Sequence, residues 1–414
     1  MRILVVSQYF WPENFRINDL VKDWCLKGYS VTVVTGIPNY PAGQVFEDYK
    51  RSPQSYTYYE GALVVRTPMV TRGESVIRLL LNYMSFIVCG SIWGAVGVRK
   101  QNFDMIFVFE PSPITVGLPA LLFGRLKQAP VVFWALDLWP ETLAAVGFVK
   151  SQVGLRLVGR LVRFIYNRCT LVLGQSRSFL PSIAKYCDDN TKIRYFPSWS
   201  EEVYDSSSVE VAPEVPQRTD LFNVLFAGNI GDAQDMPSIL RAAEILKENS
   251  NIRWLVVGDG RKYEWMKAEV EARGLQKQVL LLGRYHIDRM PSFYLHADAL
   301  LVSLKRDPVF SLTIPGKVQS YLASGIPILG MLDGEGADVV LAANAGLVCS
   351  AGASSNLADN VLKMANMSSY ARNEMGISGR VFSQQEFSRK GLLDKLDDLL
   401  DEATAIYADA EVHQ

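Results

Sequence analysis

The sequence has few cysteines and histidines, and neither residue type is grouped. Its 414 residues hold five cysteines, which are scattered along the chain and form no C-x-x-C pair. This argues against a disulfide scaffold or a zinc site and fits a reducing compartment. The three histidines, His286, His296 and His413, all lie in the second half of the chain. A histidine acid or base in the first half is therefore excluded.

The sequence also lacks a strong net charge, a secretory leader and a membrane-length apolar run. Lys and Arg number 42 and Asp and Glu number 43, so no overall basic field attracts nucleic acid. The run Ile3–Val6 is too short for the core of a signal peptide. The longest apolar region, Phe86–Val98, has about 13 residues, against the roughly 20 that span a bilayer. We therefore expect a cytoplasmic chain.

Short apolar runs alternate with amphipathic segments along most of the chain. Ile3–Val6 and Val31–Val34 are typical of buried strands, and Ile17–Trp24 between them places its apolar residues on one helical face. A strand–helix–strand unit of about 35 residues indicates a parallel sheet. The alternation continues to Phe196 and resumes after residue 220. We predict an α/β fold with two doubly wound, Rossmann-like domains facing across a cleft.

A polar stretch with two prolines interrupts this alternation and predicts the domain boundary. The expected divisions are a first domain over residues 1–205, a linker over 206–220, a second domain over 221–385 and a C-terminal helix over 386–414. A chain of 414 residues exceeds what a single hydrophobic core supports, which agrees with two domains.

Two glycine-containing loops follow strands of the second domain. Gly228 and Gly231 lie in the first loop, and the second is Gly258-Asp259-Gly260. Glycines let backbone N–H groups approach a ligand closely, and a following helix adds its dipole. The second loop lacks the third glycine of a dinucleotide fingerprint, because Tyr263 stands there. A tight turn without a ligand remains the alternative for the first loop.

Charged residues near strand ends are the candidates for chemistry. Lys317 opens a predicted helix, where a cation is unfavourable unless an anion shares the site. Lys305 and Arg306 follow another strand and are further phosphate candidates. Asp137 ends a strand of the first domain and could orient or deprotonate a hydroxyl. A solvated lysine and a turn aspartate are the alternatives.

Taken together, these segments resemble GT-B glycosyltransferases of family 4, and most closely the bacterial fucosyl/fucosaminyl-transferase-like group of surface polysaccharide assembly. The resemblance runs from Met1 to about Phe387. The segments that carry it are Asp137–Glu141, Phe196–Glu201, Ala227–Gly231, Gly258–Gly260, Ile314–Lys317 and Tyr321–Pro327.

The resemblance implies a retaining transfer from a UDP- or GDP-sugar, possibly a fucosaminyl or N-acetylated deoxyhexosyl donor, to a lipid-linked saccharide in O-antigen or capsule assembly. The second domain would bind the donor and the first the acceptor, with the C-terminal helix returning to the first domain. Asp137 and Lys317 are the catalytic candidates. The donor-binding candidates are Gly228, Asn229, Gly231, Gly258, Asp259, Gly260, Arg284, Tyr285, Lys305, Arg306, Gly316 and Ser320. The acceptor-side candidates are Asn14, Arg16, Trp139 and Glu141.

The chain departs from the family pattern at several positions. Leu312 and Ser320 stand where many members have a pair of glutamates, and Asn229 and Gln234 stand where many have arginine and lysine. The glycine-rich N-terminal loop is replaced by Pro12–Arg16. No D-x-D pair occurs to hold a metal–diphosphate complex, so we expect no metal and no cofactor. Backbone amides, Lys and Arg would then neutralise the leaving group.

Two segments of the first domain combine apolar residues with arginines. These are Ile77–Lys100 and Leu155–Arg168. Such faces suit the surface of an anionic bilayer, so peripheral docking on the inner face of the plasma membrane is expected. Two ordinary helices packed on the sheet are the alternative. Two other functions also remain open, namely a sugar-nucleotide epimerase of the same fold and a non-catalytic protein that binds a nucleotide sugar.

Overall fold

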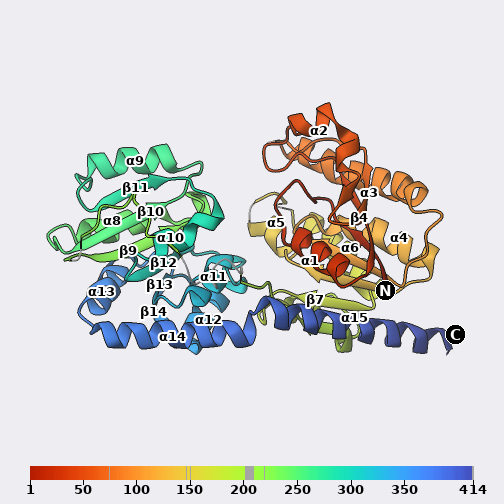
Figure 1. The fold of residues 1–414 in the computed structure, drawn as a ribbon. Coiled ribbons are helices and arrows are strands. Elements are labelled where there is room, and N and C mark those ends of the chain that lie inside the picture. The colour runs from red at the N-terminus through yellow and green to blue at the C-terminus, as the bar shows by residue number, and fades with distance from the viewer. Residues whose placement is uncertain (74, 146, 150, 201–208, 219, 413–414) are drawn as a thin grey trace. The chain divides into compact units, whose positions relative to one another are not determined.

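The structure, a computed structural model, describes the chain except for residues 74, 146, 150, 201–208, 219 and 413–414. It divides into two compact units. Unit 1 comprises Met1–Pro197 and Leu393–Gln414, and unit 2 comprises Ser198–Leu392. Each unit has its own sheet with helices on both faces (Figure 1). The predicted class of two Rossmann-like α/β domains is confirmed.

The sheet of unit 1 has the strand order β3-β4-β2-β1-β5-β6-β7-β8. All neighbouring strands are parallel except the short antiparallel pair β3–β4. The strand order reverses between β1 and β5, the kind of place where such sheets bind ligands. The strands are β1 (Arg2–Val6), β2 (Ser30–Gly36), β3 (Tyr58–Tyr59), β4 (Ala62–Thr67), β5 (Met105–Glu110), β6 (Val131–Ala135), β7 (Leu171–Gly174) and β8 (Ile193–Tyr195).

Amphipathic helices cover this sheet. The residues of Ile17–Trp24 that were expected on one helical face are buried against it. Among the other helices of unit 1, α3 packs on α4, and α4 packs on α6. The helices are α1 (Arg16–Leu26), α2 (Glu47–Arg51), α3 (Val76–Gly97), α4 (Gly117–Lys127), α5 (Glu141–Ala145), α6 (Gln152–Arg168) and α7 (Phe179–Ala184).

The last helix of the chain, α15 (Arg389–Val412), is part of unit 1 from Leu393 onward (Figure 1). Its Leu396 and Leu400 are fully buried. Ion pairs hold it at its polar edges: the Nζ of Lys27 lies 2.7 Å from Asp397 and 4.0 Å from Asp394, and Arg194 binds Glu402. Burial of its leucines explains why a helix at the end of the chain completes the first unit.

The sheet of unit 2 is parallel throughout, with the strand order β11-β10-β9-β12-β13-β14. Its strands read as continuous apolar runs because helices cover both faces. In β9, Val224 and Phe226 belong to one apolar core and Leu225 and Ala227 to the other. The strands are β9 (Phe222–Ala227), β10 (Ile252–Val257), β11 (Val279–Gly283), β12 (Ala299–Ser303), β13 (Ile328–Met331) and β14 (Gly346–Cys349).

The helices of unit 2 follow its strands with short connections. The longest of them, α14, packs on α11, where Gly376 and Gly379 allow close approach. The helices are α8 (Met236–Ile245), α9 (Tyr263–Ala272), α10 (Met290–Tyr294), α11 (Gly316–Ser324), α12 (Glu335–Ala342), α13 (Ser354–Ala365) and α14 (Ser369–Glu386).

The predicted boundaries differ from the observed division. Residues 201–208 and 219 of the region around the predicted linker lie outside the described part of the chain. The described part of the 206–220 segment packs on unit 2, where Ala212 and Val215 are buried beside Phe293. The Ala212 N–H also donates to the carbonyl of Ser292 at 3.1 Å. Two small apolar residues therefore anchor a stretch that its polar composition marked as a linker, and the units divide at Pro197 instead.

Candidate functional site

Two loops of unit 2 lie side by side at the carboxyl ends of β9 and β10. The N–H of Gly228 donates to the carbonyl of Val257 at 2.8 Å, and the N–H of Ile230 donates to the carbonyl of Asp259 at 2.8 Å. The Asp259 side chain in turn accepts the N–H of Gly260 at 2.7 Å. These bonds make the two loops a single structural element at the edge where parallel sheets bind ligands.

The glycines of these loops are required for that close packing. Gly258 has a φ of +149° and Gly260 a φ of +155°, a region that side chains disfavour. A Cβ on Gly258 would lie 1.8 Å from the carbonyl oxygen of Gly228, and one on Gly260 would lie 2.5 Å from that of Ile230. The glycine pattern thus has a structural role in addition to any contact with a ligand.

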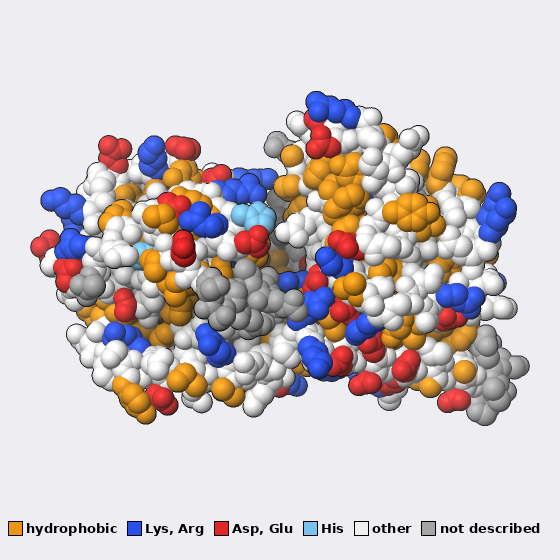
Figure 2. Space-filling view, in the orientation of Figure 1, with side chains coloured by type: hydrophobic (Ala, Val, Ile, Leu, Met, Phe, Trp, Pro, Cys, Tyr) orange, Lys and Arg blue, Asp and Glu red, His pale blue; other side chains and the backbone are white. Residues whose placement is uncertain are grey.

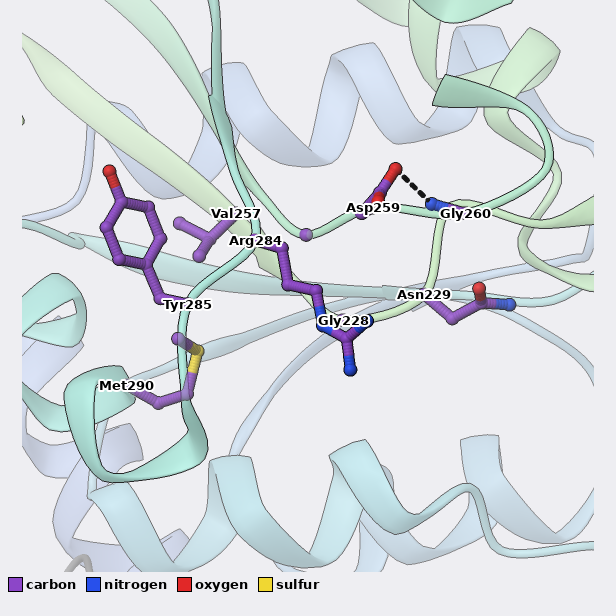
Figure 3. A pocket seen from close by; sticks show the side chains of 9 residues that line it. Gly228, Asn229, Val257, Asp259, Gly260, Arg284, Tyr285 and Met290 are labelled. Atoms are coloured by element: carbon purple, nitrogen blue, oxygen red, sulfur yellow. Dashed lines mark hydrogen bonds between the residues drawn. The ribbon is translucent and has the colours of Figure 1, made fainter. Parts of the chain in front are cut away.

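A cavity of about 390 Å³ opens against these loops. It has a polar side of loop backbone and Arg284, and an apolar side that includes Val257 and Met290. In Figure 3 the Arg284 side chain extends toward the Gly228 loop, whereas Tyr285 points away from it. The nine lining residues are Gly228, Asn229, Val257, Gly258, Asp259, Gly260, Arg284, Tyr285 and Met290. An anionic group and a flat, apolar group could both be accommodated.

Lys317 lies beneath the Gly228 loop rather than on the surface. Its Nζ is shielded from solvent and has no hydrogen-bond partner among the described residues. The amine is 3.5 Å from the centre of the Phe226 ring, and the Lys317 Cε would be 2.6 Å from a Cβ on Gly228. Burial lowers the pKa of the Lys317 amine from 10.5 to about 7. A phosphate on this loop would stabilise its charged form.

The other predicted donor residues divide into those near the cavity and those directed elsewhere. Seven line it, as given above. Gly231 and Ser320 instead make local bonds, the first from its N–H to Gln234 at 3.2 Å and the second from its hydroxyl to the carbonyl of Gly316 at 3.1 Å. Gly316 begins α11 at an exposed position.

Lys305 and Arg306 do not line this cavity. The guanidinium of Arg306 donates to the carbonyl of Ala351 at 3.2 Å and lies 3.5 Å from Asp333. The Lys305 side chain is exposed, and its N–H binds the carbonyl of Ala233. Proximity to the end of β12 suggested both residues, but the Arg306 side chain binds other partners and the Lys305 side chain is exposed.

In unit 1, Asp137 follows β6 and its carboxylate is held from two sides. It accepts the indole N–H of Trp139 at 3.1 Å and the hydroxyl of Thr142 at 2.5 Å. Burial raises the pKa of Asp137 above its usual value, while bonds from Thr142, Ser112 and Trp139 act in the opposite direction. The carboxylate is therefore fixed in orientation and is a stronger base than an exposed aspartate. Trp139 itself is buried against Tyr83.

Glu110, which the sequence analysis did not select, lies next to Asp137. It ends β5 and is fully buried. One of its carboxyl oxygens accepts the Asp137 N–H at 3.4 Å, and the other has no partner among the described residues. Burial and the neighbouring Asp137 raise the pKa of Glu110 well above its usual value. The available signal was a charged residue that closes the wholly apolar run Met105–Phe109.

The N-terminal loop places Asn14 and Arg16 differently. Asn14 is exposed after β1, whereas Arg16 is the partly buried first residue of α1. Their neighbour Glu13 is buried and accepts the N–H groups of Asn39 and Tyr40 at 2.7 Å each. Glu13 therefore ties the loop to the end of β2. Glu141 opens α5 with one buried oxygen that has no partner among the described residues.

A family model of known proteins matches the part of the chain that contains the cavity. Residues 210–381 match the family described as glycosyl transferases group 1. This range includes both glycine loops, Arg284 and Lys317. The two Rossmann-like units have a GT-B-like architecture, and this part of unit 2 is similar to the group 1 glycosyl transferases.

Two similar sequences cover most of the chain. One is described as a colanic acid biosynthesis glycosyl transferase, WcaI, of Escherichia coli (strain K12), and is 27% identical over 341 residues, or 78% of this chain and 82% of the relative. The other is a 2-deoxystreptamine N-acetyl-D-glucosaminyltransferase of Niallia circulans, 22% identical over 295 residues, or 68% of this chain and 72% of the relative.

Solved structures share the fold at lower identity. Anabaena Alr3699/HepE in complex with UDP has a TM-score of 0.68 at 13% identity, covering 97% of this chain and 100% of that one. The sucrose-phosphate synthase of Thermosynechococcus elongatus has a TM-score of 0.69 at 14% identity, covering 98% of this chain and 99% of that one. At these identities the likeness defines the architecture.

Proposed function

We propose that this chain is a retaining, metal-independent family 4 glycosyltransferase. It moves a sugar from a UDP- or GDP-sugar to a lipid-linked saccharide during assembly of a surface polysaccharide. The observation that carries the proposal is the unit 2 cavity, which two interlocked glycine loops and Arg284 line, with the buried amine of Lys317 under the Gly228 loop. It lies within the residues that match the group 1 model.

The chemistry of unit 2 suits a departing nucleoside diphosphate. The backbone N–H of Asn229, in the loop after β9, and the guanidinium of Arg284 would bind phosphate oxygens, and Lys317 would add a charge from below. As the bond to the sugar breaks, negative charge grows on the phosphate. These hydrogen-bonding and cationic groups therefore stabilise the departing diphosphate more than they stabilise the intact nucleotide sugar. The apolar side of the cavity, with Val257 and Met290, would receive the base.

In unit 1, the proposed role of Asp137 is to accept a hydrogen bond from the attacking hydroxyl of the acceptor. Trp139 and Thr142 hold its carboxylate in one orientation, and its raised pKa makes it the more effective base. We propose retention through attack on the same face as the departing diphosphate, whose oxygen takes the acceptor proton. No side chain needs to become covalently attached in this route.

Metal independence is part of the proposal. It rests on the cationic groups that the chain supplies, namely Arg284 and Lys317, which can offset the charge of a diphosphate. Within the described residues, no three His, Cys, Asp or Glu side chains cluster as a metal site.

The relatives support the substrate class. The E. coli relative is described as acting in colanic acid biosynthesis, and the Niallia relative as an N-acetyl-D-glucosaminyltransferase. Anabaena HepE was solved with UDP. A fucosaminyl or other N-acetylated deoxyhexosyl donor, used in O-antigen or capsule assembly, is our finer proposal.

A donor panel tests the proposed reaction. The chain is incubated with UDP- and GDP-sugars, with and without a polyprenyl-diphosphate saccharide, and both released nucleotide and glycolipid product are measured. The proposal expects one nucleotide class to be consumed, with product formed only when acceptor is present. Conversion of the donor to an epimer without acceptor would establish an epimerase instead, and binding without any turnover would establish a non-catalytic protein.

We also propose that unit 1 docks on the inner face of the plasma membrane through α3, α4 and α6. None of these helices contains Asp or Glu, while Arg78, Arg125, Arg156 and Arg160 are among their basic residues. By length and composition α3 could even span a bilayer, yet it also packs on β4 and α4, with 28% of its apolar window buried. Partial burial against the sheet favours lying on a surface.

The exposed face of α3 is an apolar stripe at helical spacing. Figure 2 shows orange side chains over the part of unit 1 in which Figure 1 labels α2 and α3, and charges of both signs along α9. The exposed apolar residues of α3 are Val76, Ile77, Leu80, Leu81, Met84, Val88, Ile92, Trp93 and Val96. An apolar stripe bordered by arginines and free of acids complements an anionic lipid surface.

Flotation with phosphatidylglycerol vesicles tests this surface. The double variant Leu80→Gln/Leu81→Gln replaces two leucines that are each 52% exposed, and the matched control Leu295→Gln/Leu341→Gln replaces two of 56% and 54% exposure in unit 2. We expect the first variant to lose about tenfold in vesicle affinity, since two apolar side chains no longer enter the lipid. Equal binding by both variants, or wild-type protein that does not float with the vesicles at low salt, would refute docking through α3.

A further inference from the structure

A second cavity, in unit 1, is lined almost entirely by basic and apolar groups. It lies between α6 and the end of α7 and measures about 450 Å³. Arg156, Arg160 and Arg163 enter it from α6, and Lys185 follows α7. Tyr186 closes it against α6, and the described residues that line it include no acidic side chain. We call this the α6 basic cavity.

The positive charge in this cavity is only partly balanced: Asp188 pairs with Arg163, and the charge of Glu141 acts on the lining residue Tyr186. Arg163 lies 2.5 Å from Asp188. No carboxylate among the described residues lies within 4 Å of Arg156, Arg160 or Lys185. Arg156, Arg160 and Arg163 follow one another at helical spacings of four and three, so like charges lie together on one face and destabilise the helix. A bound anion would relieve this repulsion.

The cavity adjoins the loop that carries Asp137. Pro140, three residues after Asp137, lines it. Three residues of chain reach at most about 11 Å, a distance that a short saccharide can span. On the same helix Val153 and Leu157 are exposed, next to the surface proposed to meet lipid. A ligand here would thus have an anionic group in the cavity, a lipid on one side and a saccharide toward Asp137.

We propose that the α6 basic cavity binds the diphosphate that joins the acceptor saccharide to its lipid. Arginine forks bind phosphate oxygens in pairs, which gives both charge and geometry. The identification of the anion as part of an acceptor rests on the proposed function. Recognition of a lipid diphosphate by this cavity is a separate claim about binding, and it can be tested without turnover.

The test compares two vesicle types of equal surface charge. One contains polyprenyl diphosphate and the other contains phosphatidylglycerol, each in neutral phosphatidylcholine, with EDTA present. The variant Arg156→Gln/Arg160→Gln removes two exposed arginines that make no ion pair with described residues. The control Arg125→Gln/Arg168→Gln removes the same charge from α4 and α6 outside the cavity. Thermal unfolding of each variant checks that the fold is retained.

The wild type is expected to bind the diphosphate vesicles about tenfold more tightly, because charge-assisted bonds to two arginines are gained. The Arg156→Gln/Arg160→Gln variant should lose this preference, while the control should bind both vesicles somewhat more weakly and keep it. Equal binding of the wild type to both vesicles, or a preference retained without Arg156 and Arg160, would overturn the proposal. If the donor panel shows no transfer while the preference persists, the proposed function fails and the binding site stands.

Discussion

At the scale of single residues, Lys317 shows what sequence can and cannot reveal. Its position at the start of a helix indicated a phosphate contact, and the structure places it under the glycine loop of unit 2. Its desolvation against Phe226 could not be inferred, since that depends on how α11 meets β9. Glu110 was missed for a related reason: a residue at the end of a strand can be solvated or buried, and only packing decides which.

We predict that Lys317→Met increases stability at neutral pH while weakening donor binding. The pKa of this amine is about 7 in the folded chain against 10.5 when exposed. Between these values the unfolded chain binds more protons, so the wild-type free energy of unfolding rises with pH from about 7 toward 10.5. The variant lacks this dependence and should gain on the order of 3 kcal/mol at pH 6.5, where the buried charge costs most.

Urea unfolding at pH 6.5 and pH 9, with nucleotide titration on the same samples, checks this prediction. A variant that is less stable than the wild type at pH 6.5, or one that binds the donor nucleotide normally, would contradict the role assigned to Lys317.

We predict that Asp137→Asn slows transfer without affecting donor binding. Asparagine keeps a similar shape beside Trp139 and Thr142 but is not a base. Loss of the charge-assisted hydrogen bond that the carboxylate accepts from the acceptor hydroxyl costs about 1.5–3 kcal/mol, or roughly 10- to 10²-fold in rate. The measurement is kcat for glycolipid formation together with the Kd of the nucleotide. An unchanged kcat would remove Asp137 from the mechanism.

At the scale of elements, several strands could be predicted from their apolar runs, whereas other elements gave no clear signal. The apolar runs at β1, β2, β5, β9 and β10 each gave a clear signal. The strand β3 has only two residues, and β14 begins with glycine and is only partly buried. Without the buried, β-branched pattern, neither resembles a strand in the sequence. The packing of the described part of the predicted linker on unit 2 gave no signal either, because burial of Ala212 and Val215 depends on contacts distant in sequence.

The interlocked glycine loops yield an element-level prediction. Gly258→Ala places a Cβ 1.8 Å from the carbonyl of Gly228 at a φ of +149°, so the loops must separate. We expect at least about tenfold weaker nucleotide binding and a loss of roughly 1–3 kcal/mol in stability. The control Gly90→Ala meets only ordinary contacts at 3.6 Å in α3. Titration calorimetry measures nucleotide binding by both variants. Normal binding by Gly258→Ala would show that the loop geometry is not needed.

The docking of α15 on unit 1 yields a second prediction at the scale of elements. Leu400 is fully buried, whereas Ile406 on the same helix is 40% exposed. We expect Leu400→Ala to cost about 2–5 kcal/mol of unfolding free energy, and Ile406→Ala to cost about 0.5 kcal/mol or less. Chemical denaturation, monitored by tryptophan fluorescence, measures the free energy of unfolding of each variant. Similar values for both variants would mean that α15 does not stabilise the unit.

At the scale of the whole molecule, the chain builds two separate Rossmann-like units, and each presents a distinct chemistry at the carboxyl edge of its sheet. Unit 2 offers amides and cations suited to a diphosphate, and unit 1 offers an oriented carboxylate beside a basic cavity. Alternation of strands and helices predicted this division of the fold. The prediction that the last helix returns to unit 1 came from the family resemblance. A leucine pattern alone does not specify which surface the helix covers.

The central claim is that the chain's own amides and cations, in unit 2, stabilise a departing nucleoside diphosphate. The most direct measurement is the rate of transfer from the preferred nucleotide sugar in excess EDTA, compared with the rate in millimolar Mg²⁺ or Mn²⁺. The account predicts rates within about twofold of each other, with activity lost in Lys317→Met under both conditions. Turnover that disappears with EDTA and returns with a divalent cation would contradict it.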